Sequence, residues 1–186
     1  AMIDANERIR YDTRNRNLLK TRNALLLKFL YLTAARRSEA ANLKWENLQQ
    51  DGEFQVVILQ QTKSGESQKL KLRMELFEEL ECWNETLKTN QIECEWVFPS
   101  LSFRTLGGKM SGKGVNDVVS KLGSAIGLKI SAHYLRHTAI TLALELGEPL
   151  QKVQSYARHA SANTTIRYFH DQQFLEKNPT DRLPMI

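Results

Sequence analysis

The sequence lacks the features that mark several common classes of protein. It contains two cysteines, Cys82 and Cys94, without CxxC spacing or a nearby histidine, which favours reduced thiols, with a disulfide as the lesser alternative. It has no run of about 18 apolar residues, as a membrane-spanning helix requires, and no apolar signal-peptide segment at its N-terminus. We therefore expect a cytoplasmic protein.

A glycine-rich basic segment at residues 100–114 does not match a nucleotide-binding loop. It contains Gly107, Gly108, Lys109 and Lys113, and a loop of this composition can approach phosphate groups closely. It lacks the GK[ST] ending of a P-loop and does not follow a clear strand-to-helix pattern. Nucleotide binding is therefore not expected.

Charge is distributed unevenly along a chain with a formal net charge of +5. Basic residues outnumber acidic ones in residues 1–30 and 101–139, whereas glutamates dominate residues 75–95. This segregation predicts one basic face suited to a phosphate backbone and one acidic face turned to solvent. Because the 186 residues contain no repeat or linker and 41% of them are hydrophobic, we expect a single domain covering residues 1–186.

The spacing of apolar residues predicts a mainly helical chain with one β-hairpin. Two β-rich runs, residues 53–61 and 69–73, flank a turn that places Lys63 near the hairpin tip. A short helix is expected near residues 38–43, with Ser38 or Thr33 as its cap. The longer helices are predicted at residues 17–35, 74–89, 115–126, 131–147 (capped by Ser131), 149–159 (with Pro149 in its first turn) and 164–170.

A dense polar cluster, His133-Tyr134-Leu135-Arg136-His137, begins the helix after Ser131. His133, Arg136 and His137 occupy positions i, i+3 and i+4, so they lie on one side of the first turn, near the positive end of the helix dipole. An anion fits this position. The rival is a zinc pair of histidines, but a zinc hydrolase would need a glutamate after the first histidine, and Arg136 repels a second cation.

His137 taken alone has a simpler explanation than ligand binding. A histidine on an otherwise apolar helix is more often a buried core residue with its hydrogen bonds satisfied, or a residue supporting the site. Arg36 and Lys63 taken alone would more often be solvated surface residues, and Tyr168 a half-buried packing residue. Only their joint spacing points to a function.

The joint spacing resembles the catalytic domain of the tyrosine recombinases, the phage-integrase family. The resemblance runs from Arg36 to Tyr168 in the family's order and depends on three motifs: Thr33-Ala34-Ala35-Arg36-Arg37-Ser38-Glu39-Ala40, His133-x-Leu135-Arg136-His137, and His159-Ala160-Ser161-Ala162-Asn163-Thr164-Thr165-Ile166-Arg167-Tyr168. It implies an α+β fold, predominantly α-helical, with a small antiparallel β-hairpin or three-stranded sheet.

The resemblance also implies a role for each matched residue. Arg36 and Arg136 would clamp the phosphate, Lys63 would be the hairpin lysine and Tyr168 the nucleophile. The remaining candidates are the further activators His133 and His159, the supporting residues Glu39 (an orienting acid or a salt-bridge partner) and His137, and the DNA-binding residues Arg37, Lys109, Lys113 and Arg158.

Two positions depart from the family's usual pattern. Ala34 and Arg158 stand where the family commonly has glycine, before Arg36 and His159 respectively. Both are backbone or packing positions in the family, so only local loop geometry is affected. Arg158 could also add a contact to a DNA phosphate.

The implied reaction is site-specific DNA recombination without a metal or other cofactor, through a 3′-phosphotyrosyl intermediate. The alternatives are DNA relaxation like that of a type IB topoisomerase and a DNA-binding module without catalysis. The expected partner is double-stranded DNA, with a homotetramer on DNA and residues 171–186 exchanged between protomers. The family's N-terminal core-binding domain is not among these 186 residues, and a bacterial or phage-encoded, nucleoid-associated protein is expected.

Overall fold

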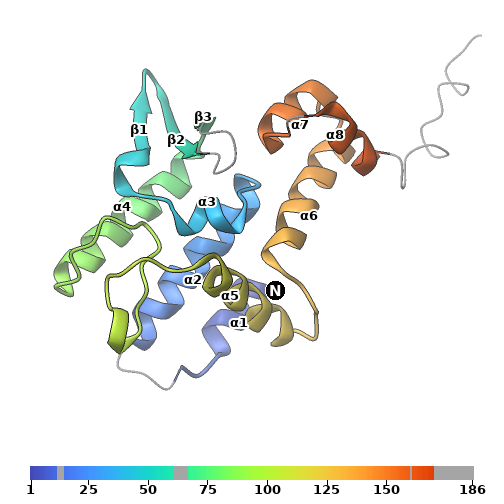
Figure 1. The fold of residues 1–186 in the computed structure, drawn as a ribbon. Helices are drawn as coiled ribbons and strands as arrows, with labels where there is room; N and C mark the ends of the chain where they lie inside the picture. Colours follow the sequence, from blue (N-terminus) through green and yellow to red (C-terminus); the bar gives the residue numbers. More distant parts are fainter. Residues whose placement is uncertain (12–14, 61–66, 160, 170–186) are drawn as a thin grey trace, which may run out of the picture.

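The fold is built mainly from helices, with one small antiparallel sheet (Figure 1). The computed structural model describes residues 1–11, 15–60, 67–159 and 161–169, so the tail at residues 171–186 lies outside it. The predicted α+β class is confirmed, and no helix of the described ranges is long and apolar enough to cross a membrane. In chain order the elements are α1 (Met2–Arg8), α2 (Arg16–Leu32), α3 (Arg37–Ala41), the 3-10 helix η1 (Trp45–Asn47), β1 (Leu48–Asp51), β2 (Phe54–Gln60), β3 (Ser67–Lys71), α4 (Met74–Thr89), the 3-10 helix η2 (Phe103–Thr105), α5 (Gly112–Ser124), α6 (Ala132–Glu145), α7 (Leu150–Ala157) and α8 (Ala162–Phe169).

Helix α2 lies at the centre of the larger part of the structure. Its Phe29 is fully buried, and the helix packs against α1, α3, α4 and α6. The apolar periodicity predicted a helix over residues 17–35, but α2 ends at Leu32. The Thr33 hydroxyl donates to the Phe29 carbonyl at 2.6 Å. The helix stops because Ala34 then takes a left-handed φ of 45°, which a right-handed helix cannot continue.

The short helix α3 begins directly after this turn, with Arg36 at its N-cap. The predicted caps, Ser38 and Thr33, are wrong. Glu39 caps the helix instead, because its Oε2 accepts a hydrogen bond from the backbone N–H of Arg36 at 2.7 Å. One buried carboxylate therefore satisfies an amide that the helix itself leaves without a partner.

The sheet has the order β1-β2-β3, with both pairs antiparallel. The predicted hairpin corresponds to β2 and β3, and Val57 of β2 lies between Leu48 of β1 and Leu70 of β3. Strand β1 is short and mostly exposed, so its sequence carries no apolar alternation that would indicate a strand. The turn at residues 61–66, and Lys63 with it, lies outside the described residues.

Side-chain caps fix the starts of helices α5 and α6. The Ser131 hydroxyl accepts from the backbone N–H of Tyr134 at 3.3 Å, which confirms the predicted cap of α6. Helix α5 begins three residues earlier than predicted because Ser111 caps it in the same way. Asn116 of α5 also accepts from the backbone N–H of Ala132 at 3.1 Å, so the two helix starts are joined.

The buried apolar side chains form two clusters. The larger one joins α2, α3, α4, α5 and the sheet, while the smaller one joins α6 and α7 through residues such as Ile140 and Val153. Helices α7 and α8 lie together on one side of the molecule, where α6 leads to them (Figure 1). Ala34 belongs to the smaller cluster and Ala35 to the larger one, so the turn before α3 lies where the two clusters meet.

Candidate active site

A cleft of about 530 Å³ opens between the start of α3, helix α5 and the first turn of α6. Arg36 and Arg37 line it from one side, Asn116 from α5, and His133 and Arg136 from α6. The structure thus brings together three of the predicted catalytic residues, Arg36, His133 and Arg136, although Arg36 and Arg136 are about 100 residues apart in the chain. With Arg37, four cationic or ionisable side chains surround the cleft and make it suitable for an anion.

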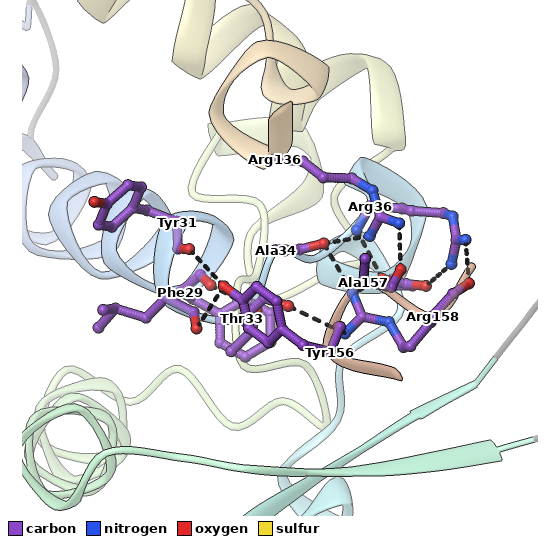
Figure 2. Close-up of polar contacts among 11 residues, drawn as sticks. Phe29, Tyr31, Thr33, Ala34, Arg36, Arg136, Tyr156, Ala157 and Arg158 are labelled. Carbon is purple, nitrogen blue, oxygen red and sulfur yellow. Dashed lines mark hydrogen bonds and ion pairs between the residues drawn. The ribbon is translucent and has the colours of Figure 1, made fainter. Parts of the chain in front are cut away.

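Arg136 is held by two backbone carbonyls from different segments. Only 3% of the residue is exposed. Its Nη1 donates to the Ala34 carbonyl and its Nη2 to the Ala157 carbonyl (Figure 2). The planar guanidinium is therefore fixed in orientation before any ligand arrives, as preorganised charge stabilisation requires.

Arg36 is the more accessible of the two arginines. Its Nη1 lies 2.6 Å from Glu39 Oε1, and its Nη2 donates to the Arg158 carbonyl at 2.9 Å (Figure 2). Its side chain is 39% exposed, so it combines fixed partners with access from the cleft. This arrangement suits a side chain that receives a ligand without moving far.

Glu39 is a buried acid that lies between Arg36 and Arg158. Its side chain is 2% exposed, and its oxygens accept from the Arg36 backbone, the Arg36 side chain and, at 3.0 Å, Arg158 Nη2. Burial alone would raise the pKa of this carboxyl, but Arg158 and Arg36 outweigh burial and hold the pKa below its ordinary value. The geometry agrees with both roles considered for Glu39, because it orients Arg36 and forms the salt bridges.

The two histidines of the α6 cluster differ in their surroundings. His133 is exposed and lines the cleft at the N-terminal end of the helix. His137 is exposed as well, with its Nδ1 3.4 Å from the hydroxyl of Thr141 on the next turn. The interpretation of His137 as a buried core histidine is therefore wrong, since one face of α6 at this position is open to solvent.

His159 follows α7 and is half-buried beside α8. Its Nδ1 lies 2.9 Å from the hydroxyl of Thr165. Burial lowers the pKa of His159, and the charges of Arg136, Arg36 and Arg158 lower it further, to about 4. His159 is therefore neutral at neutral pH, with one ring nitrogen able to accept a proton.

Tyr168 lies in the last turns of α8, nine residues after His159. Helix α8 packs against α6 and α7, which carry Arg136 and precede His159 respectively. The position of the Tyr168 side chain is not among the described features, and Lys63 lies outside the described residues altogether. Both assignments therefore stay predictions.

The proposed DNA-binding residues divide into exposed and buried ones. Arg37, Lys109 and Lys113 are exposed, and Lys109 Nζ lies 5.2 Å from the centre of the Trp96 ring. Arg158 is only 3% exposed, and its guanidinium bonds to groups of the protein interior. The expectation of a phosphate contact from Arg158 is therefore wrong, because the side chain points inward from the end of α7.

Sequence reasoning missed the acceptors that hold the arginines. The carbonyls of Ala34 and Ala157 are main-chain groups, so no residue type marks them. Asn116 lines the cleft and holds the start of α6, but its contact with Ala132 spans 16 residues and follows no local pattern. The one sequence feature that pointed to these carbonyl segments was the presence of Ala34 and Arg158 where the family commonly has glycine. Both residues have left-handed backbone conformations.

Fold and site together define a class of protein. A predominantly helical α+β domain presents two prearranged guanidinium groups and a helix N-terminus at one cleft, which is suited to binding a phosphate group. The chain belongs to the phage integrase family, whose sequence profile matches residues 4–174.

Curated relatives are tyrosine recombinases. One from Synechococcus elongatus is 31% identical over 173 residues, which cover 91% of this chain and 53% of that protein. The tyrosine recombinase XerA of Pyrococcus horikoshii is 32% identical over 147 residues, covering 79% of this chain and 50% of XerA. The chain therefore spans about half the length of the curated relatives it matches.

Solved recombinase structures share the fold. XerH bound to its palindromic difH substrate in a post-cleavage complex superposes with a TM-score of 0.76 at 24% identity, covering 94% of this chain and 48% of that one. XerA gives a TM-score of 0.73 at 22% identity, covering 100% of this chain and 62% of the XerA chain. A lambda integrase tetramer bound to a Holliday junction gives a TM-score of 0.59 at 18% identity, covering 90% of this chain and 44% of the integrase chain.

Replacing Glu39 by glutamine should destabilise the protein strongly. The change leaves two guanidinium groups, one of them buried, without their carboxylate, so we expect a loss of about 3–5 kcal/mol in the free energy of unfolding by urea. Glu75→Gln is the matched control, because Glu75 pairs with Arg73 at the surface and should change the value by about 1 kcal/mol or less. Equal losses in the two variants would contradict the role given to Glu39.

His159 should titrate well below the ordinary range of histidine. Its ring signals in an NMR titration, assigned by comparison with His159→Gln, should shift near pH 4. Because its pKa is lowered on folding, the unfolded chain binds more protons between about pH 6.5 and 4, so this residue makes the protein less stable as the pH falls through that window. A titration midpoint near 6.5 would contradict the burial and charge environment described for it.

Proposed function

We propose that the chain is the catalytic part of a site-specific DNA recombinase that cleaves and rejoins strands through a covalent link to Tyr168. The observation that carries the proposal is the cleft where Arg36 and Arg136, fixed by Glu39 and by backbone carbonyls, meet His133. Membership of the phage integrase family and the tyrosine recombinase relatives support it.

The reaction is a transfer of one phosphodiester bond. The Tyr168 hydroxyl loses its proton and its oxygen bonds to the phosphorus, while the bond from phosphorus to the 5′ oxygen breaks and that oxygen takes a proton. The strand then carries a 3′-phosphotyrosyl link. Attack by a 5′ hydroxyl of a partner duplex reverses the step and releases Tyr168, so the bond energy is kept and no nucleotide cofactor is needed.

Each predicted catalytic residue has a role in this proposal. Arg36 and Arg136 stabilise the negative charge that grows on the non-bridging oxygens, and His133 adds a donor at the positive end of the α6 dipole. Neutral His159 can accept a hydrogen bond from the Tyr168 hydroxyl, which an imidazolium could not do, and the cationic surroundings favour loss of the tyrosine proton. Lys63 is our choice for the acid that protonates the leaving oxygen, because an ammonium both donates a proton and stabilises charge.

Double-stranded DNA is the proposed substrate and partner. Solved relatives with the same fold include recombinases bound to DNA and a lambda integrase tetramer bound to a Holliday junction, so we propose a homotetramer on DNA. The exposed cations Arg37, Lys109 and Lys113 would contact the phosphate backbone near the cleft. The proposed exchange of residues 171–186 would join neighbouring protomers in that assembly.

A covalent protein–DNA complex is the decisive test. The protein is incubated without added metal with 5′-labelled duplexes that carry a nick beside a randomised sequence, so that the short leaving strand dissociates and resealing fails. A labelled protein band on a denaturing gel is expected from the wild type and should be absent from Tyr168→Phe.

The outcomes separate the rival functions. A covalent band that persists in Tyr168→Phe would refute the nucleophile. Binding without any covalent band would favour a DNA-binding module, and covalent bands without transfer to a second duplex would favour relaxation of the topoisomerase type.

Arg36→Lys should cleave at least about 100-fold more slowly than the wild type. The substrate is a duplex that the wild type cleaves, recovered from the set of duplexes with a randomised sequence. Lysine keeps the charge but loses the planar fork that pairs with Glu39 and the phosphate, and the loss of one preorganised donor costs about 3 kcal/mol. Lys88→Ala, an exposed change near the end of α4, is the control and should cleave at the wild-type rate. A rate for Arg36→Lys within a few-fold of wild type would remove Arg36 from the reaction.

A further inference from the structure

Arg158 ends helix α7 with a left-handed backbone, φ 54° and ψ 45°. This turn presents two consecutive carbonyls to the site: Ala157 accepts from Arg136, and Arg158 itself accepts from Arg36 at 2.9 Å. Two of the arginines that line the cleft, Arg36 and Arg136 (called the cleft arginines below), are therefore held by the chain around Arg158. The Arg158 side chain is not part of the cleft lining, since 1% of it is exposed.

The Arg158 guanidinium shares its acceptors with the same two arginines (Figure 2). Its Nη2 donates to the Ala34 carbonyl at 2.8 Å, which also accepts from Arg136. The same Nη2 lies 3.0 Å from one oxygen of Glu39, whose other oxygen pairs with Arg36. One guanidinium thus touches a partner of each cleft arginine.

Two further bonds anchor this guanidinium to the end of α2 and to its own helix. Its Nη1 donates to the Thr33 carbonyl at 3.1 Å and to the Tyr156 carbonyl at 2.9 Å. Arg158 therefore ties α7 to the turn that precedes α3, across the meeting point of the two hydrophobic clusters. Four acceptors in different directions leave the planar group one orientation.

The charges of the cluster support the same role. Arg36, Arg136 and Arg158 carry three positive charges, and Glu39 is the carboxylate paired with two of them. Arg158 holds Glu39 from the buried side, at 3.0 Å, so that Glu39 is fixed without drawing Arg36 into the interior. Arg36 then keeps its exposed edge toward the cleft.

We propose that Arg158 is a positioning residue for strand cleavage: it fixes the Ala34 carbonyl and the Glu39 carboxylate, and through them sets Arg136 and Arg36 for the scissile phosphate. This inference rests on the proposed function. Arg158 touches no reacting atom and acts through its shared acceptors. A displacement of the Arg36 and Arg136 guanidinium groups by about 1 Å is enough to slow the reaction by about 10- to 100-fold.

The test is Arg158→Gly, because glycine adopts φ 54° without strain and leaves the Arg158 carbonyl in place while removing the guanidinium. Gln91→Gly is the matched control, since Gln91 is exposed, lies after α4 and has a similar φ of 59°. The rate constant of covalent-complex formation is measured in a single turnover at saturating nicked duplex, apart from the final amplitude and the DNA affinity.

We expect Arg158→Gly to lower this rate constant about 10- to 100-fold, with DNA affinity within about 3-fold of wild type, and Gln91→Gly to match the wild type. A role in stability alone would reduce the amplitude, which reports the folded fraction, and leave the rate constant unchanged; that result would overturn the proposal. If Arg158→Gly does not fold, Arg158→Lys decides by the same criterion, since lysine keeps the charge but loses the fork.

A second measurement separates this inference from the proposed function. The guanidinium N–H signals of Arg36 and Arg136 are followed by NMR in the protein without DNA, where they should exchange with water faster in Arg158→Gly than in the wild type or Gln91→Gly. Unchanged exchange would overturn the positioning role. Suppose that the wild type forms no covalent complex and that the guanidinium N–H signals exchange faster in Arg158→Gly than in the wild type. That pair of results would refute the cleavage reaction and keep the positioning role.

Discussion

Three arginine side chains share a few acceptors where the two hydrophobic clusters meet, and the rest of the site depends on this sharing. The Ala34 carbonyl accepts from both Arg136 and Arg158, and the Glu39 carboxylate joins Arg158 to Arg36. Like charges this close would repel each other in an interior of low polarity, so the guanidinium groups need oxygen acceptors between them. The cluster is therefore both an interface between α3, α6 and α7 and the wall of the cleft.

The backbone had to take unusual conformations to supply those oxygens. Ala34 and Arg158 both have positive φ angles, which cost a residue with a side chain about 1–2 kcal/mol each. At Ala34 the turn ends α2 and directs its carbonyl at two arginines; at Arg158 the turn ends α7 and directs a carbonyl at Arg36. Four hydrogen bonds from its own side chain offset the cost at Arg158.

The same positive charges set the state of the neighbouring histidine. Arg136, Arg36 and Arg158 add to burial in lowering the pKa of His159, so the groups that suit the cleft to an anion also keep this imidazole neutral. His133 occupies a different environment, exposed on the first turn of α6. A site with one neutral histidine and fixed guanidinium groups separates the handling of protons from the stabilisation of charge.

The sequence by itself determined the class of fold, most helices, the Ser131 cap and the placement of His133 and Arg136 on one turn of α6, because periodicity and capping are local properties of the chain. The grouping of Arg36 with them followed only from the resemblance to the tyrosine recombinases. Tertiary structure alone decided that His137 is exposed, that β1 forms and that Arg158 points inward. An arginine after a helix is normally solvated, and its acceptors at Glu39 and Ala34 lie more than 100 residues away. Contacts at that separation leave no local pattern, so only the folded chain could reveal them.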